Sequence, residues 1–337
     1  MSHVTLVIPS NRPSAVLSDC LSSVAAQEFD LGRLEVVIVF NGLPAPPRWD
    51  RARWPFRLQT DFIAEASICA AKNRALELAS GKWIILLNDD GRLAPGFVAA
   101  HLRAHQRLGQ PALVLGASPF ATYADEALFD RLIAETSMIF FYDRMHPRAW
   151  YNFRHAWNLN LSFRRADIGH VRFDERLVPV NFDDIEWAYR LEQQRGLKVW
   201  YEPEASLVHE HRYTLESYLG RETHLGRMAA LLWKCNPACF EALYGSGLDH
   251  VLADAQRFVQ AEAVHGAELQ TALEPVLARR VDEFAAPPLV FREFLRALYL
   301  AHRPLKRLTF YRGLLSASAG LPRAARNASN TWRMTTV

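Results

Sequence analysis

Two aspartates, Asp89 and Asp90, follow directly after the apolar run 82–87, with Asn88 between the run and the pair. An apolar run of this kind predicts a strand that is buried on both faces of a sheet. In open α/β sheets, ligands bind beyond the carboxyl ends of the strands. A carboxylate at that place can hold a hard divalent cation, Mg²⁺ or Mn²⁺, which also binds phosphate oxygens. Asn, Asp and Gly also favour turns, so a turn without a ligand is the alternative.

A second pair of aspartates, Asp183 and Asp184, opens a predicted helix over Asp183–Arg195. Carboxylates in the first turn of a helix ordinarily cap it and interact with its dipole. The functional alternative is a general base, which must lie within hydrogen-bonding distance of the hydroxyl whose proton it removes.

Two histidines, His209 and His211, lie at the end of the predicted strand 206–209. If the strand continues, alternation places both side chains on one face. Their spacing differs from the HExxH pattern, which excludes that class of metalloprotease. The pair is therefore either an ordinary surface feature or a pair of metal ligands.

Strands and helices in alternation are expected to position these groups. Apolar runs rich in β-branched residues predict the strands, and apolar residues at helical spacing predict the helices. The alternation indicates an α/β sheet with right-handed crossovers. The expected strands are 4–9, 34–40, 82–87, 112–116, 158–163, 198–201 and 206–209, and the expected helices are 14–26, 64–79, 95–108 and 183–195.

The pattern becomes helical beyond Thr214, so we expect a first domain over residues 1–213 and a helical region over 214–337. From Phe294 onward there are eight basic and no acidic residues, which leaves 31 basic and 36 acidic residues in the remainder. Apolar and cationic residues alternate over 289–315 as in a helix that lies in an anionic membrane interface. The alternative is that this apolar stripe packs on the protein's own core. A nucleic-acid partner is not expected, because the tail has no recognisable binding module.

The composition is that of a globular protein. Half of the 337 residues are hydrophobic and 22% are charged. No apolar run approaches the roughly 18 residues of a membrane span, and the first residues do not have the pattern of a signal peptide. We therefore expect a cytoplasmic protein, in which the four cysteines are buried thiols rather than disulfides or zinc ligands.

Five segments, in order, resemble family 2 of the inverting glycosyltransferases, whose members share the GT-A fold. They are VTLVIPSNRPSAVLSDCLSSVAAQ, LEVVIVFNG, AKNRALELASGKWIILLNDDGRLAPGF, NLSFRRADI and FDERLVPVNFDDIEWAYRLEQQRGLKVWYEPEASLVHEH. The third resembles the stretch that contains the family's metal-binding DxD motif. The fifth resembles its xED helix, the strand that follows and a metal-binding histidine. The resemblance implies a GT-A type sheet, mixed but mostly parallel and Rossmann-like, flanked by helices and followed by a helical C-terminal region.

The resemblance also implies roles for the metal-site residues. Asn88 and Asp90 match the outer positions of the DxD motif, which makes Asp90 the principal metal ligand. His209 best matches the metal-binding histidine, and His211 is the alternative.

The base and the donor site follow from the same comparison. Asp184 matches the base of the xED motif, and Asp183 stands where Glu is usual. Residues expected to bind the nucleotide sugar are Pro9, Ser10, Asn11, Asn41, Lys72, Asn73, Asn88 and Asp89.

The implied activity is metal-dependent transfer of a hexose or deoxyhexose from a nucleotide-diphosphate donor to the hydroxyl of a saccharide or lipid-linked acceptor. Mg²⁺ or Mn²⁺ would stabilise charge on the leaving diphosphate, while the base removes the acceptor proton. One base without a protein nucleophile implies inversion at the anomeric carbon. Synthesis of a bacterial cell-surface polysaccharide or glycolipid would be the setting, in the cytoplasm or at the inner face of the membrane.

Two departures from the family pattern bear on the donor. The second strand ends in Phe40, Asn41 and Gly42, where the family often has an Asp that touches the nucleotide base. The sequence therefore does not identify the base of the donor as uracil, thymine or guanine. Asn88 replaces the first Asp of the DxD motif.

Two other functions compete with glycosyl transfer. A non-catalytic nucleotide-sugar-binding relative is disfavoured because Asp90, Asp184 and His209 are all present. A sugar nucleotidyltransferase usually has a Gly-rich, basic loop after its first strand, and residues 10–13 of this chain contain no glycine.

Overall fold

The computed structural model describes residues 4–50, 52–178, 181–284 and 286–319. The chain divides into two compact units, one of Met1–Ala121 and Phe140–Arg212, the other of Thr122–Ile139 and Tyr213–Val337. The first unit was expected to be continuous over residues 1–213. Instead, Thr122–Ile139 belongs to the helical unit, because its helix α4 (Leu128–Glu135) packs on helices of that unit through buried apolar residues.

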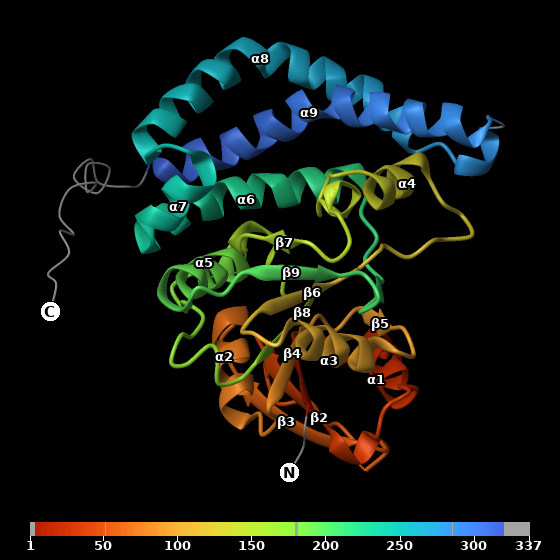
Figure 1. The fold of residues 1–337 in the computed structure, drawn as a ribbon. Coiled ribbons are helices and arrows are strands. Elements are labelled where there is room, and N and C mark those ends of the chain that lie inside the picture. Colours follow the sequence, from red (N-terminus) through yellow and green to blue (C-terminus); the bar gives the residue numbers. More distant parts are fainter. Residues whose placement is uncertain (1–3, 51, 179–180, 285, 320–337) are drawn as a thin grey trace, which may run out of the picture. The chain divides into compact units, whose positions relative to one another are not determined.

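A mixed sheet is the core of the first unit (Figure 1). Within the described residues its strand order is β3-β2-β1-β4-β8-β6-β9-β7, and β5 pairs with β10 in a separate small sheet. The strands are β1 (Val4–Ser10), β2 (Leu34–Asn41), β3 (Arg57–Ile63), β4 (Trp83–Leu87), β5 (Gly91–Leu93), β6 (Leu113–Gly116), β7 (Trp150–Tyr151), β8 (Asn160–Arg164), β9 (Val199–Glu202) and β10 (Leu207–His209).

Strands β3, β2, β1 and β4 run parallel, as do β6 and β9, whereas β8 is antiparallel to β4 and β6. Every residue of β1 and β2 is buried, as expected for strands covered on both faces. The helices of this unit are α1 (Ala15–Ala25), α2 (Ile68–Leu78), α3 (Phe97–Leu108) and α5 (Asp183–Arg195). The expected architecture, a mostly parallel sheet flanked by helices with a helical C-terminal region, is confirmed.

Strands β3, β5 and β7 were not expected from the sequence. Strand β3 has polar residues at Arg57 and over 59–61 and lies at an edge of the sheet, so it has no continuous apolar run. Strands β5 and β7 are three and two residues long, too short to show a period. Helix α2 begins later than expected, because Ser67 caps it by accepting a hydrogen bond from the Ala70 amide.

Two buried histidines of α3 tie that helix to strand β8. The His101 ring lies 2.8 Å from Asn160 Oδ1 through Nε2 and 2.8 Å from Ser162 Oγ through Nδ1. His105 Nε2 lies 2.9 Å from the same hydroxyl, and its ring stacks on Trp83. Because burial penalises the charged imidazole, the pKa of His101 is lowered to about 4 and that of His105 to about 3.

These histidines predict a fall in stability on mild acidification. Above about pH 7.5 both rings are almost entirely neutral in the folded and the unfolded chain, so they contribute little pH dependence. As the pH falls further, the two histidines bind protons in the unfolded chain but not in the folded one. The free energy of unfolding therefore decreases until the pH reaches the folded pKa values. We expect a loss of roughly 2–3 kcal/mol per histidine between about pH 6.5 and 4.5.

Urea unfolding of the protein and of His105→Phe across this range measures the loss. Phe keeps the stacking on Trp83 but cannot titrate, so the variant should have a smaller slope of unfolding free energy against pH. His170→Gln, at an exposed position, is the control and should keep the full slope. Equal slopes for the protein and His105→Phe would show that His105 ionises normally.

The second unit consists of helices, with α6 packed along α9 and α9 along α8 (Figure 1). Gly226 of α6 and Gly313 of α9 allow close approach, since a Cβ at either place would lie 2.0 Å from a carbonyl oxygen of the other helix. The helices of this unit are α4, α6 (Leu215–Cys235), α7 (Pro237–Tyr244), α8 (Leu248–Leu277) and α9 (Pro288–Ser318).

The stripe predicted over residues 289–315 forms part of α9, and most of it is packed within the unit. Its buried members are Leu295, Leu298, Leu305, Leu308 and Leu314. These side chains are therefore not free to enter a lipid surface. Three of the eight basic residues after Phe294, namely Arg323, Arg326 and Arg333, lie outside the described residues, so their predicted role at a membrane surface has no structural test here. In the described part of the chain, no helix is both long and apolar enough to cross a membrane.

Candidate functional site

Strand pairing brings Asp90 and His209 together. Asp90 lies in the turn between β4 and β5, and β5 pairs antiparallel with β10 so that His209 is opposite Gly91. The Glu210 amide donates to the Asp90 carbonyl at 2.8 Å, which extends the contact by one residue. A Cβ at Gly91 would lie 3.2 Å from the Leu207 side chain, so glycine suits this close pairing. Residues separated by more than a hundred positions are thereby held face to face.

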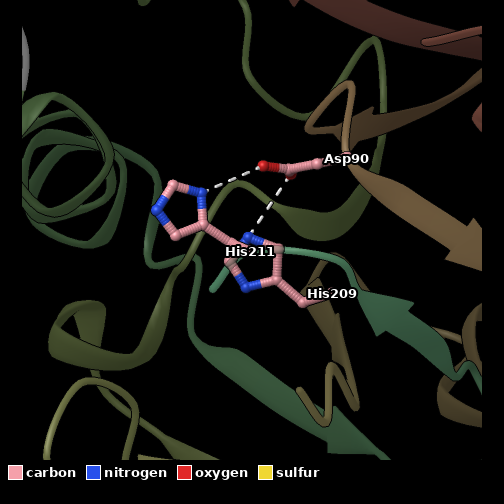
Figure 2. A group of neighbouring side chains, drawn as sticks. All are labelled: Asp90, His209 and His211. Atoms are coloured by element: carbon pink, nitrogen blue, oxygen red, sulfur yellow. Dashed lines mark ion pairs between the residues drawn. The ribbon is translucent and has the colours of Figure 1, made fainter. Parts of the chain in front are cut away.

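Both histidines face the Asp90 carboxylate (Figure 2). His209 Nε2 lies 3.3 Å from Asp90 Oδ1, and His211 Nδ1 lies 3.5 Å from Asp90 Oδ2. Asp90 and His209 are buried, whereas the His211 side chain is 37% exposed. Strand β10 ends at His209, yet the two imidazoles are nearly parallel with centroids 5.8 Å apart. The sequence comparison offered His209 first and His211 as the alternative, and the structure brings both imidazoles to the same carboxylate.

The three side chains fit a divalent cation. One ligand atom from each lies within 4.8 Å of the others. Ligand atoms of a cation with bonds of about 2.1 Å lie about 3 Å apart when adjacent, close to the separations seen here. Asp90 Oδ1 is buried and, within the described residues, makes no well-formed hydrogen bond. A buried carboxylate oxygen without a hydrogen bond needs another partner, and a bound cation would supply it.

The Asp90 carboxylate is held in its charged form. Burial alone would raise its pKa, but the adjacent imidazoles of His209 and His211 and the charge of Arg12 outweigh burial and leave the pKa well below its usual range. The carboxylate is therefore anionic at any pH at which the protein works.

Arg12, in the loop after β1, pairs with both aspartates. Its Nη2 lies 2.8 Å from Asp89 Oδ1 and 2.6 Å from Asp90 Oδ2. Ser10 Oγ donates to Asp89 Oδ2 at 2.6 Å, so Asp89 connects the end of β1 to the turn after β4. Arg12 was not among the expected site residues; its only signal in the sequence was its place directly after the first strand.

The other residues expected to bind the donor occupy neighbouring strand ends. Asn41, the last residue of β2, donates from Nδ2 to the Ser10 carbonyl at 3.2 Å. Pro9 and Ser10 are buried at the end of β1, Asn11 is exposed and Asn88 is half-buried after β4. Because β1, β2 and β4 are parallel, these residues share one edge of the sheet.

Helix α2 supplies two residues that anchor the segment before α5. Lys72 Nζ lies 2.6 Å from Asp183 Oδ2, and both side chains are almost fully buried. Asn73 bonds the Phe173 backbone at both its amide and its carbonyl and donates to Glu175 Oε1. Lys72 thus contacts the first turn of α5 and Asn73 the segment before it; their expected contact with the donor stays a prediction.

The start of α5 is strained. Asn181 and Phe182 have φ values of 91° and 61°, in the region that favours glycine. For a bulky residue such as Phe182 this conformation costs about 1–3 kcal/mol and persists only where the surroundings enforce it. The strain adjoins Asp183 and Asp184, as is common at functional sites.

Asp184 is a candidate base by its pKa as well as its position. Burial raises the pKa of this carboxyl, and the adjacent Asp183 carboxylate raises it further, while Lys72 opposes both; the result is about 6. A carboxylate with such a pKa is mostly ionised at neutral pH and is a stronger proton acceptor than an ordinary aspartate.

Aromatic rings extend outward from His209. Its ring lies 4.9 Å from that of Phe120 and 6.1 Å from that of Phe140. Phe140 packs on Trp157 at 5.1 Å, and Trp157 packs on Phe141 at 5.8 Å. The Phe141 side chain is 39% exposed, so this aromatic series leads from His209, a candidate metal ligand, to the surface.

No protein-family model matches the chain, and no curated protein matches it in sequence. Among solved structures, it is similar to TarS of S. aureus in complex with UDP-GlcNAc, with 12% identity over 94% of this chain and 91% of that one and a TM-score of 0.46. It is also similar to the mannosyltransferase PcManGT from Pyrobaculum calidifontis in complex with GDP-Man and Mn²⁺, with 18% identity over 96% and 77% and a TM-score of 0.47. Likenesses of this size assign no function to the chain.

Proposed function

We propose that the protein is a metal-dependent inverting glycosyltransferase of the GT-A type, related to family 2, which transfers a sugar from a nucleotide diphosphate to an acceptor hydroxyl. The observation that supports this best is the group of Asp90, His209 and His211 at the carboxyl edge of parallel strands, the place where α/β sheets bind ligands. A separate carboxylate with a raised pKa, Asp184, is available as base.

Asp90, His209 and His211 would hold the metal. Two imidazoles and one carboxylate form a donor set that suits a transition metal better than Mg²⁺, which prefers oxygen ligands. Of the two cations expected from the sequence, Mn²⁺ is therefore the preferred cofactor in this proposal. When bound, the metal supplies positive charge to the leaving diphosphate.

Asp184 would accept the proton of the attacking hydroxyl. Lys72 neutralises the neighbouring Asp183 and fixes the first turn of α5, so that one carboxylate of the pair remains for proton transfer. One base without a second carboxylate acting as nucleophile gives a single displacement, which inverts the anomeric centre, by analogy with glycoside hydrolysis.

The pKa of Asp184 predicts the pH dependence of transfer. A base works only when deprotonated, so kcat/KM should fall as the pH drops below about 6. In Asp183→Asn a negative neighbour is lost and the acid limb should move to lower pH. In Lys72→Met a positive neighbour is lost and the limb should move to higher pH. Identical limbs in all three proteins would exclude Asp184 as the titrating base.

The aromatic series beside His209 supports a saccharide acceptor. Sugar rings have an apolar face, and exposed aromatic rings such as Phe141 offer a surface against which that face can be buried. A polysaccharide or glycolipid under construction would present such a ring, as in the synthesis of bacterial cell-surface glycans.

Attraction to an anionic membrane would be mainly electrostatic in this proposal, because the leucines at the centre of the apolar stripe of α9 are buried, although Leu289 and Val290 at its start are exposed. The exposed basic residues of α9 are Arg292, Arg296, Arg303, Arg307 and Arg312. At about 1 kcal/mol for each residue near the membrane surface, they would hold the protein there reversibly.

We expect co-sedimentation of the protein with phosphatidylserine vesicles at low salt and its release at high salt. Replacing Arg296, Arg303 and Arg307 by Gln should abolish it; unchanged sedimentation would reject the membrane surface as a partner. Truncation is unsuitable as a test, since α9 is part of the unit's core.

Thermal unfolding with a panel of UDP-, GDP- and dTDP-sugars tests the proposed function. A ligand that binds only the folded protein raises the melting temperature. We expect one nucleotide to stabilise the protein strongly with Mn²⁺ and weakly with chelator. No stabilisation by any nucleotide sugar in the presence of Mn²⁺ would contradict the proposal.

A further inference from the structure

Arg12 is an internal cation held against the carboxylates of the candidate metal site. Its guanidinium contacts Asp89 through Nη2 and Nε, at 2.8 and 3.2 Å, and Asp90 through Nη2 at 2.6 Å. The hydrogen bond to Asp89, with the charges of both aspartates, raises the pKa of Arg12, so it stays protonated. Charge-assisted contacts of this length are among the stronger hydrogen bonds in proteins.

The contact of Arg12 with Asp90 occupies Oδ2, the carboxylate oxygen that faces His211. Asp90 Oδ2 faces Arg12 at 2.6 Å and His211 Nδ1 at 3.5 Å. A divalent cation ligated by Asp90 and His211 would lie next to the guanidinium, and like charges at that separation repel. The Arg12 side chain is 42% exposed, so it can turn away from Asp90 into solvent.

The backbone beneath Arg12 is anchored independently of that contact. Ser10 donates to Asp89, and Asn41 donates to the Ser10 carbonyl. A guanidinium released from Asp90 would therefore remain at the carboxyl edge of β1, where the donor's diphosphate is expected. Guanidinium groups match phosphate oxygens in geometry and charge.

We propose that Arg12 occupies the cation position at Asp90 in the metal-free protein, is displaced when a divalent cation binds, and then pairs with the diphosphate of the donor. Both the metal at Asp90 and the identity of that anion rest on the proposed function. Metal alone must break an ion pair without compensation, whereas metal arriving with a diphosphate gives Arg12 a new partner. The metal and the nucleotide should therefore bind cooperatively, each raising the affinity for the other by the same factor.

Calorimetric titration with Mn²⁺ alone, and again in saturating UDP or GDP, tests this. Arg12→Ala should bind Mn²⁺ alone about tenfold more tightly than the unchanged protein, because no ion pair has to break. The same variant should show a smaller gain in Mn²⁺ affinity on addition of nucleotide. Arg12→Gln keeps a hydrogen-bonding side chain without the charge and should behave like Arg12→Ala. Agreement between the two variants would show that the effect does not come from a change in the loop caused by the smaller alanine.

Arg74→Ala is the matched control, since Arg74 pairs with Asp61 and Glu77 rather than with the site, and it should titrate like the unchanged protein. Weaker or equal Mn²⁺ binding in both Arg12 variants would overturn the inference and make Arg12 a support for Asp90. Failure of the unchanged protein to bind Mn²⁺, with or without nucleotide, would instead remove the metal site on which the proposed function depends.

Discussion

Asp90→Ala is expected to reduce transfer at least about 10³-fold, because it removes the principal metal ligand and with it the charge that stabilises the leaving diphosphate. The variant should also lose the rise in melting temperature that Mn²⁺ causes. The fold should persist, since Asp89 keeps its bonds to Ser10 and Arg12. Initial rates of transfer with the best donor, and thermal unfolding with and without Mn²⁺, measure both effects.

Asp61→Ala is the control for Asp90→Ala. Asp61 is a carboxylate of β3 in the same unit, paired with Arg74, and its loss should leave Mn²⁺ binding and transfer unchanged. The metal assignment would be wrong if Asp90→Ala kept near-normal transfer, or if the unchanged protein worked at full rate in excess chelator.

Asp184→Asn is expected to lower kcat by about 10²–10⁴-fold, the usual contribution of a general base. Asparagine has nearly the same shape and keeps a side-chain oxygen that can accept from the Ile185 amide, as Asp184 does at 2.8 Å. Donor affinity, measured by titration with nucleotide and Mn²⁺, should therefore change little. The loss should appear in kcat rather than in the donor KM.

Asp183→Asn separates the two carboxylates. It breaks the ion pair with Lys72 and should shift the pH profile, but it should retain more activity than Asp184→Asn at pH values where Asp184 is ionised. The opposite ranking, with Asp183→Asn inactive and Asp184→Asn near normal, would transfer the role of base to Asp183.

Local sequence patterns predicted the strands that are buried along their whole length and the helix whose two ends carry clear sequence signals. Strands β1, β2 and β4 are apolar runs because both of their faces are buried. Helix α5 begins and ends as expected, because acidic residues occupy its first turn and Gly196 ends it in the left-handed conformation. Such signals lie within the element itself.

The contacts that assemble the candidate site are long-range, and the sequence does not encode them locally. The pairing of β5 with β10 rests on three residues in each strand, too few to show a period. The ion pair of Lys72 with Asp183 joins residues 111 positions apart, and nothing in the sequence near either residue predicts it. The helical period of α9 was correctly predicted, yet a period does not reveal whether an apolar face meets protein or lipid.

Phosphorus NMR of the protein with its stabilising nucleotide sugar, Mn²⁺ and a saccharide acceptor measures directly whether the protein transfers sugar. We expect the donor resonances to be replaced by those of a free nucleoside diphosphate, and we expect chelator or Asp90→Ala to stop the change. An unchanged donor spectrum would indicate a protein that binds without catalysis. Formation of sugar 1-phosphate and nucleoside triphosphate on addition of pyrophosphate would indicate a nucleotidyltransferase and contradict the account.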